Sequence, residues 1–256
     1  MIALCVSIWE TGEPGPQSFV SSMDHPSIRL RWIVTAPALV LPLVASFFYF
    51  VFFPGTAFGN GCYVAIKLFL LTWPLIAGLA ILREKPGAGW GTKRRRRGVI
   101  EGGIFGIATS LLLFGLLQLP FFAALLQEQR PVIEAKVEGL GVAEHFLLFA
   151  VFLSVAHAWL EEFYWRWFVY GQLRRLVSQP LAHGLAAAGF ASHHIVILSQ
   201  FFPLPWGAAF GVCVGLGGLA WSLLLERHRS LTAPWFSHMI IDFAAMAVAW
   251  WILNSG

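Results

Sequence analysis

Apolar residues fill seven stretches of the chain, and each stretch is close to the length that crosses a lipid bilayer. The hydrocarbon core of a bilayer takes about 20 residues of helix, and lipid offers no partner for unpaired backbone groups. The pattern therefore predicts an all-α fold, a polytopic bundle of transmembrane helices. The expected spans are residues 33–53, 61–82, 99–119, 146–170, 181–199, 206–225 and 232–253.

Two other stretches are too polar to cross a bilayer. Residues 1–30 mix Pro and Gly with polar residues, which is typical of a loosely ordered tail, and residues 31–256 then form a single membrane domain. Residues 120–145 carry both acidic and basic side chains, which favours an amphipathic helix at one membrane face. An eighth, partial membrane helix in this stretch is the alternative, so we expect seven or eight spans.

The composition agrees with a membrane protein, because 58% of the residues are hydrophobic and only 12% are charged, whereas a soluble domain is about a quarter charged. The formal net charge of +4 does not indicate nucleic-acid binding, because the basic residues lie in short loops between spans. With seven spans, all four basic clusters fall on one side, which the bias of Lys and Arg makes cytoplasmic. We therefore expect an integral protein of the bacterial plasma membrane, with a cytoplasmic N-terminus. The clusters are Arg29 with Arg31, residues 83–98, Arg174 with Arg175, and residues 226–229.

The ionisable residues inside the predicted spans are concentrated in three of them, and each costs roughly 2.5–3.5 kcal/mol near a helix centre. The fourth span holds Glu161, Glu162 and Arg166, together with His157. Glu162 and Arg166 are spaced i,i+4, so they share a helix face and can pair. Glu161 points about 100° away, toward the face of His157, and this pairing does not neutralise it.

The fifth span adds His193 and His194, and the seventh adds His238 and Asp242. Counted from the basic helix ends, the acid and the imidazoles lie at a similar depth in the cytoplasmic half of the bilayer. A carboxylate in an apolar enclosure can act as a general base, and imidazoles can relay protons or stabilise an oxyanion. These are the groups that water-driven hydrolysis of an acyl group needs.

Three motifs in these spans resemble one known family. "EEFYWR" fits EExxxR, "FASHH" fits FxxxH through Phe190 and His194, and "HMIID" fits HxxxN/D through His238 and Asp242. In order, spacing and placement they are similar to the CPBP family of intramembrane proteases, which includes CAAX prenyl endopeptidases and bacteriocin-processing proteins. The resemblance covers about residues 145–250. Motifs of other membrane proteases, such as HExxH, are absent from the sequence.

The resemblance implies a role for each motif residue. Glu161 would activate water with the help of His194, and His238 and Asp242 would hold the oxyanion. Glu162 and Arg166 would pair and, with Phe190, orient the site. The family often has Asn where this chain has Asp242, and an ionised Asp would repel an oxyanion unless it were protonated or bound His238 instead.

The resemblance leaves the cofactor and the substrate open. Members of the family are often described as metal-dependent, and from the residues alone Glu161, His194 and His238 could ligate zinc, but a mechanism without metal fits equally. The expected partner is a membrane-anchored protein or peptide, cut near the cytoplasmic side. CAAX processing, leader-peptide removal and cleavage of a C-terminal sorting signal would all need the same groups.

Other interpretations of the same residues also stand. The chain could be a non-catalytic immunity or scaffold protein that keeps the site and binds a partner, or an ion-coupled transporter, although no inverted repeat supports the latter. A buried Glu162–Arg166 pair is often structural, and a single buried histidine often serves packing. We expect His183 and His228, at predicted loop edges, to be solvated, and Lys67 to extend out of the second span.

Overall fold

The computed structural model of the chain describes residues 26–84 and 92–254, and those residues form helices without any strand. Most of the predicted N-terminal tail therefore lies outside the described residues, and the first helix begins at Ile28. Several helices change locally to the wider π-helical pattern, and these segments carry the label η. The elements in chain order are α1 (Ile28–Ser46), η1 (Phe47–Phe52), α2 (Ala57–Pro74), η2 (Leu75–Ile81), α3 (Thr92–Leu117), α4 (Pro120–Gly139), the 3₁₀ turn η3 (Ala143–His145), α5 (Phe146–Phe152), η4 (Leu153–His157), α6 (Ala158–Glu161), η5 (Glu162–Tyr170), α7 (Gly171–Leu176), α8 (Gln179–Leu198), α9 (Leu204–His228) and α10 (Thr232–Asn254).

Seven continuous helical segments of the described chain are long and apolar enough to span a membrane, which confirms the predicted spans and the all-α bundle. The chain is therefore an integral membrane protein. The fourth segment is the longest, 34 residues over Ala143–Leu176, and it runs through η3, α5, η4, α6, η5 and α7. Residues 120–145 do not add a full span. They form helix α4 and the turn η3, as the mixed charges of this stretch predict.

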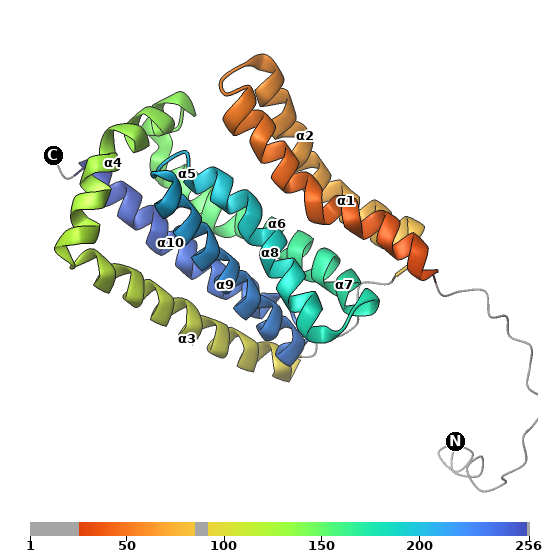
Figure 1. The fold of residues 1–256 in the computed structure, drawn as a ribbon. Coiled ribbons are helices and arrows are strands. Elements are labelled where there is room, and N and C mark those ends of the chain that lie inside the picture. The colour runs from red at the N-terminus through yellow and green to blue at the C-terminus, as the bar shows by residue number, and fades with distance from the viewer. Residues whose placement is uncertain (1–25, 85–91, 255–256) are drawn as a thin grey trace, which may run out of the picture.

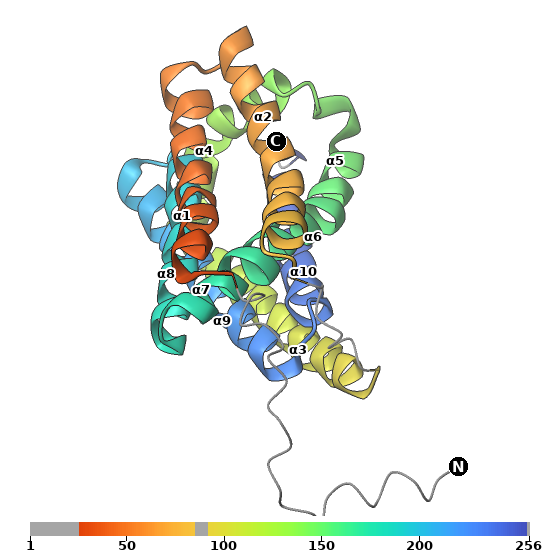
Figure 2. The same ribbon diagram turned by 90° about the vertical axis from the view of Figure 1, so that its right-hand side faces the viewer.

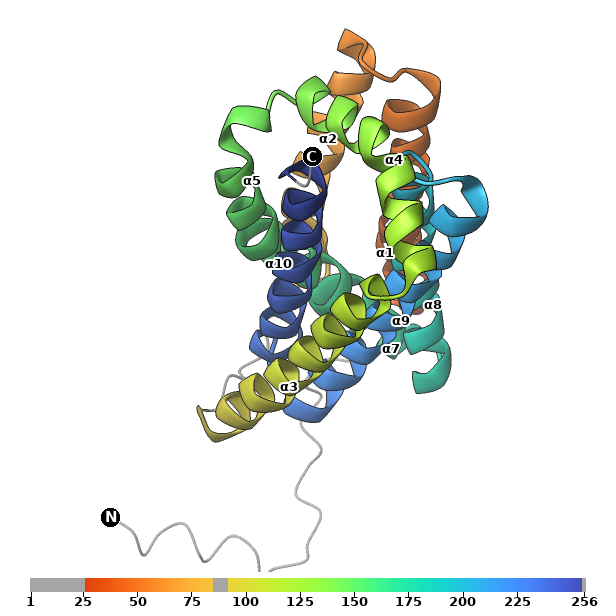
Figure 3. The same ribbon diagram turned by 90° about the vertical axis from the view of Figure 1, so that its left-hand side faces the viewer.

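The helices form an open arrangement around the fourth segment. In Figure 1, α3, α10, α9 and α8 run side by side, and α1 and α2 form an antiparallel hairpin on the α8 side. In Figure 2, α6 and α7 cross between that hairpin and the layer of α3, α9 and α10. Figure 3 shows how α4 links the end of α3 to α5 across the end of α10, where Leu126 and Ile133 pack against Val248 and Ile252.

Glycines let the two closest helix pairs touch along their length. On α9, Gly207, Gly211 and Gly215 face α8, and a Cβ on Gly215 would lie 2.7 Å from Cβ of Ala191. On α3, Gly102 faces the backbone of Ala233 on α10 in the same way. Lipid provides no hydrophobic drive for helices to associate, so close van der Waals contact between small residues holds such pairs together.

The arginine-bearing helix ends meet at one end of the bundle. Arg31, in the first turn of α1, pairs with Glu84 after η2, and Arg175 at the end of α7 pairs with the same carboxylate at 2.9 Å. Arg174 pairs with Glu226 near the end of α9 at 2.7 Å. These ion pairs join helix ends that the topology prediction assigns to a single membrane side.

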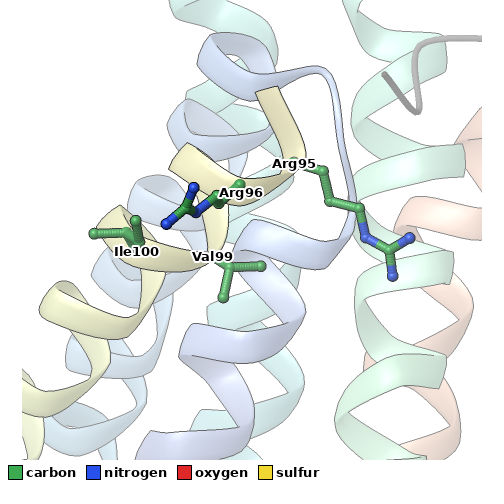
Figure 4. Close-up of a pocket in the computed structure, with 4 residues that line it drawn as sticks. All are labelled: Arg95, Arg96, Val99 and Ile100. Carbon is green, nitrogen blue, oxygen red and sulfur yellow. The ribbon is translucent and has the colours of Figure 1, made fainter. Parts of the chain in front are cut away.

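The basic start of α3 lies at the same end. Arg227 and His228 at the end of α9 contact Glu101 on α3, at 2.9 Å and 3.0 Å. A shallow depression at this place is lined by Arg95, Arg96, Val99 and Ile100, and Figure 4 shows the two arginine side chains extending in different directions from the helix. It is separate from the ionisable residues of the fourth, fifth and seventh spans.

Candidate active site

The ionisable residues of three spans meet inside the bundle. Glu161 ends α6, and Glu162 and Arg166 lie in η5, where the π-helical pattern continues to Tyr170. His194 lies on α8 and His238 on α10. π-helical turns inside α-helices are frequent at functional sites, and this one begins at the second of the two adjacent glutamates.

Glu161 lies at the centre of a group of imidazoles. Its side chain is buried, and its carboxylate oxygens lie 3.4 Å from Nε2 of His157, 3.9 Å from Nε2 of His193 and 3.7 Å from Nε2 of His238. The three histidines come from η4, α8 and α10. The structure thus brings an acid and imidazoles from three separate spans into one cluster, within the membrane-spanning part of the chain.

The histidines of α8 are oriented by the carbonyl oxygens of their own helix. Nδ1 of His194 lies 2.8 Å from the carbonyl oxygen of Phe190, and Nδ1 of His193 lies 3.3 Å from that of Gly189. A carbonyl oxygen only accepts hydrogen bonds, so each Nδ1–H donates. The Nε2 atom of a neutral ring then carries a lone pair that is available to a water molecule or a metal ion.

His238 is held on both of its ring edges. Its Nδ1 lies 2.8 Å from Oε1 of Glu162 and donates to that carboxylate, while its Nε2 lies 3.5 Å from Oδ1 of Asp242. The ring stacks on the indole of Trp221, with centroids 4.0 Å apart and planes inclined by 16°. The Trp221 Nε1–H donates in turn to Oγ of Ser237. Few other orientations of the imidazole are compatible with these contacts.

Glu162 and Arg166 form a pair with almost no solvent exposure. Nε of Arg166 lies 3.1 Å from Oε2 of Glu162, and the side chains are 2% and 1% exposed. The guanidinium lies 4.4 Å from the centre of the Phe190 ring and 4.8 Å from that of Trp221. On α9, a Cβ at Gly218 would come within 3.2 Å of Nη2 of Arg166. The pair is thus enclosed by aromatic rings. The hydrogen bond between Glu162 and His238 connects it to the cluster around Glu161.

One subset of the cluster also fits a metal ion. One oxygen of Glu161 and one ring nitrogen each of His193 and His194 lie within 4.8 Å of one another. Two imidazoles and a carboxylate are a known ligand set of catalytic zinc, and Nδ1–H bonds to carbonyl groups commonly orient metal-bound imidazoles. This set contains His193 in place of the His238 that the sequence suggested.

A comparison with family models identifies the segment that carries this cluster. Residues 143–244 match the model described as type II CAAX prenyl endopeptidase Rce1-like. This segment is therefore similar to an Rce1-like domain. It contains all three motifs from Glu161 to Asp242, which confirms the resemblance to CPBP intramembrane proteases. Comparisons with curated proteins and with solved structures gave no match.

Sequence reasoning left out several residues of this segment that the structure brings to the cluster. The spacing from Phe190 selects His194, yet the neighbouring His193 also faces Glu161; the His193-His194 doublet was the available signal. Trp221 and Gly218 lie on α9, in a predicted span without charged residues, and no pattern marked them. Only the fold brings α9 against the Glu162–Arg166 pair.

The expectation for two other histidines was wrong. His183 and His228 are buried, not solvated. His183 lies 2.6 Å from Oγ of Ser222 on the next helix, and His228 lies 3.0 Å from Oε2 of Glu101. Both partners are distant in sequence, so the helix ends at which these histidines lie are covered by neighbouring helices.

Proposed function

We propose that the chain is an intramembrane endopeptidase that hydrolyses a peptide bond of a membrane-anchored protein or peptide. The observation that carries the proposal is the buried carboxylate of Glu161, with Nε2 atoms of His157, His193 and His238 within 3.9 Å. An ionisable side chain inside a membrane costs free energy, so by default it indicates a functional site. The match of residues 143–244 to type II CAAX prenyl endopeptidases supports hydrolysis as that function.

In the proposed reaction, Glu161 accepts a proton from a water molecule, and the water oxygen attacks the carbonyl carbon of the scissile bond. The free Nε2 of His194 accepts a hydrogen bond from the second water proton and so orients the attack. Glu161 then gives its proton to the leaving nitrogen, the C–N bond breaks, and a new carboxyl group and an amine result. No proton has to be supplied from outside the site.

The oxyanion that forms in this reaction needs a donor, and His238 is the candidate. Its Nε2 lies 3.7 Å from Glu161 and its other nitrogen is held by Glu162, so a proton on Nε2 would point to the place where the attacked carbonyl lies. We assign Asp242, whose Oδ1 lies 3.5 Å from the same Nε2, to stabilise by its negative charge the ring that carries a proton on both nitrogens. This role requires no protonated Asp, whereas direct contact with the oxyanion would.

Glu161, His193 and His194 would hold a divalent ion if one is bound. Such an ion would make bound water more acidic and polarise the carbonyl group. The residues do not require it, because Glu161 and His194 together provide a base and an orienting acceptor for water. We therefore propose the metal-free reaction.

We further propose that the arginine-rich end of the bundle faces the cytoplasm, in a bacterial plasma membrane. The ion pairs among Arg31, Arg175 and Glu84 hold several helix ends on that side. A cysteine placed after α9 would then react with a membrane-impermeant reagent only in inverted vesicles, and labelling of intact cells would contradict this topology.

The decisive experiment tests cleavage by the purified protein in detergent or lipid. The first substrate is a synthetic peptide that ends in a prenylated cysteine and three further residues; leader peptides and C-terminal sorting sequences follow. We expect Glu161→Gln to lower kcat by about 10²–10⁴-fold, the usual contribution of a general base. Glu144→Gln is the matched control, because Glu144 lies in the turn η3, outside the cluster.

The same assay separates this proposal from the main alternative. A non-catalytic immunity or scaffold protein would cut no peptide, and Glu161→Gln would leave its partner binding unchanged. An ion-coupled transporter would carry ions across vesicle membranes and cut nothing. Either result, obtained with folded protein and the full set of peptides, would overturn the proposal.

A further inference from the structure

Lys67 is a charged residue in the middle of a membrane span. It lies on α2, about 15 Å along the helix from Ala57 and about 21 Å from Ile81 at the other end of the span. It is the only Asp, Glu, Lys or Arg between those two residues. A cation near the bilayer centre costs roughly 2.5–3.5 kcal/mol and by default indicates a functional site. At this depth Lys67 is too far from either surface for its side chain to reach water easily.

The structure gives Lys67 an aromatic neighbour and no acidic one. Its Nζ lies 5.3 Å from the centre of the Tyr63 ring, and the Tyr63 ring packs edge-on against that of Tyr49 at 5.3 Å. Within residues 26–84 and 92–254, no carboxylate pairs with Lys67 and no hydrogen bond engages either phenol. The ammonium of Lys67 and the two phenol hydroxyls on η1 and α2 therefore have no ion-pair or hydrogen-bond partner among the described residues.

This hairpin cluster belongs to the surroundings of the proposed active site. α2 packs against α6 and η5, the elements that carry Glu161 and Glu162. Glu161 lies about 22 Å along its span from Leu176, and Lys67 about 21 Å from the end of its own span at the same side of the bundle. The two residues are thus at a similar depth, yet they do not form an ion pair with each other.

We propose that Lys67, with the hydroxyls of Tyr49 and Tyr63, binds the free C-terminal carboxylate of the substrate. This assignment rests on the proposed peptidase function and restricts it to bonds near the end of a chain. A carboxylate provides the ion-pair partner that Lys67 lacks, and phenol hydroxyls can donate to its oxygens. Three extended residues reach about 10 Å at most, so a bond cut beside Glu161 would lie few residues from that terminus.

A lipid phosphate is the other anion present in a membrane, and its position argues against it. Headgroup phosphates lie outside a hydrocarbon core about 30 Å thick, roughly 15 Å from its middle. Lys67 is near that middle. An anion that reaches this depth must be attached to a chain that enters the site, as the terminus of a bound peptide is.

The experiment compares two prenylated peptides that differ only in a C-terminal carboxylate or carboxamide. For the wild-type protein we expect kcat/KM to be about 10–100-fold higher for the acid, mostly through KM. Lys67→Met should lower cleavage of the acid to the level of the amide and leave the amide unchanged, while Lys67→Arg keeps the preference. Lys136→Met on α4 removes a lysine far from the hairpin and should change neither rate.

Binding measurements keep this test independent of catalysis. We would measure the affinity of both peptides for Glu161→Gln protein, with and without Lys67→Met. Tighter binding of the acid that disappears with Lys67→Met supports the carboxylate site even if no peptide is cut. Equal binding of acid and amide, or an acid preference that persists in Lys67→Met, overturns it. Failure of cleavage by wild-type protein, with the acid preference in binding intact, would instead count against the proposed peptidase function.

Discussion

Replacing Arg166 with methionine should destabilise the protein strongly, although Arg166 is not proposed to touch the substrate. The change removes a buried cation 3.1 Å from the Glu162 carboxylate and leaves that carboxylate in an environment with almost no solvent exposure. Breaking one partner of a buried ion pair costs about 3–5 kcal/mol. The variant also loses the stacking of the guanidinium on Phe190 and Trp221, which methionine replaces in part. We therefore expect a loss of about 4 kcal/mol.

Two companion variants test the physical reason. Arg166→Lys keeps the charge but loses the planar stacking, and should cost only about 1–2 kcal/mol. The double variant Glu162→Gln with Arg166→Met removes both charges, so it should be about 2–3 kcal/mol more stable than Arg166→Met alone. The amide that replaces the Glu162 carboxylate would still offer a carbonyl oxygen to Nδ1 of His238, so we expect the double variant to keep measurable peptidase activity.

The assay is denaturation of the purified protein in mixed detergent micelles, followed by tryptophan fluorescence, together with peptide cleavage by the folded fraction. Arg175→Met is the control, because Arg175 pairs with Glu84 at 2.9 Å but is 54% exposed, and such pairs contribute about 1 kcal/mol or less. If Arg166→Met were as stable as Arg175→Met, or no less stable than the double variant, the ion pair would not be a coupled buried unit and our account of it would be wrong.

Three further predictions concern the cluster and its supports. Asp242→Asn should keep kcat within about tenfold, because an amide oxygen still places partial negative charge beside the protonated ring of His238, whereas Asp242→Leu should lower kcat about 10²-fold. An equal loss of kcat in both variants would show that the carboxylate itself is required. His193→Ala should lower kcat about 10–100-fold, and a zinc chelator should leave wild-type kcat unchanged; loss of activity on chelation, restored by zinc, would contradict the metal-free reaction. Gly211→Ala should cost about 1–3 kcal/mol in the same denaturation assay, because its Cβ would lie 2.8 Å from Cα of Ile195, while Gly184→Ala, with open space around it, should cost nothing.

The sequence was sufficient to predict the helical spans, because every helix that crosses a bilayer needs a similar number of predominantly apolar residues. It also predicted the stretch around α4, where mixed charges exclude a full span. The change from α to π pattern at Glu162 could not be predicted, because it depends on how η5 packs between several neighbours. The burial of His183 was missed for a similar reason, since its partner Ser222 belongs to the next helix.

For the candidate site, the residues that are costly in a membrane were also those that a sequence can identify. Glu161 and His238 stand out because ionisable side chains are rare in apolar spans. The residues that orient them do not stand out. Trp221 is one of twelve tryptophans in the chain, and only the contact between α9 and α10 shows that its ring supports His238. Motif spacing predicts which residues face one another on one helix, but not which residue of another helix lies against them.

The adjacent glutamates show how one short sequence can support two different functions. Consecutive helical residues point in different directions, so Glu161 and Glu162 meet different neighbours although they share the same depth in the membrane. Glu162 is matched by a guanidinium and by a donor on His238, and its charge is therefore fixed in place. Among residues 26–84 and 92–254, the ionisable partners of Glu161 are imidazoles, which can accept or release a proton as its own charge changes. A carboxylate that must take a proton from water and return it to a leaving amine needs neighbours of the second kind, so the assignment of the base to Glu161 follows from its partners as much as from its position in the motif.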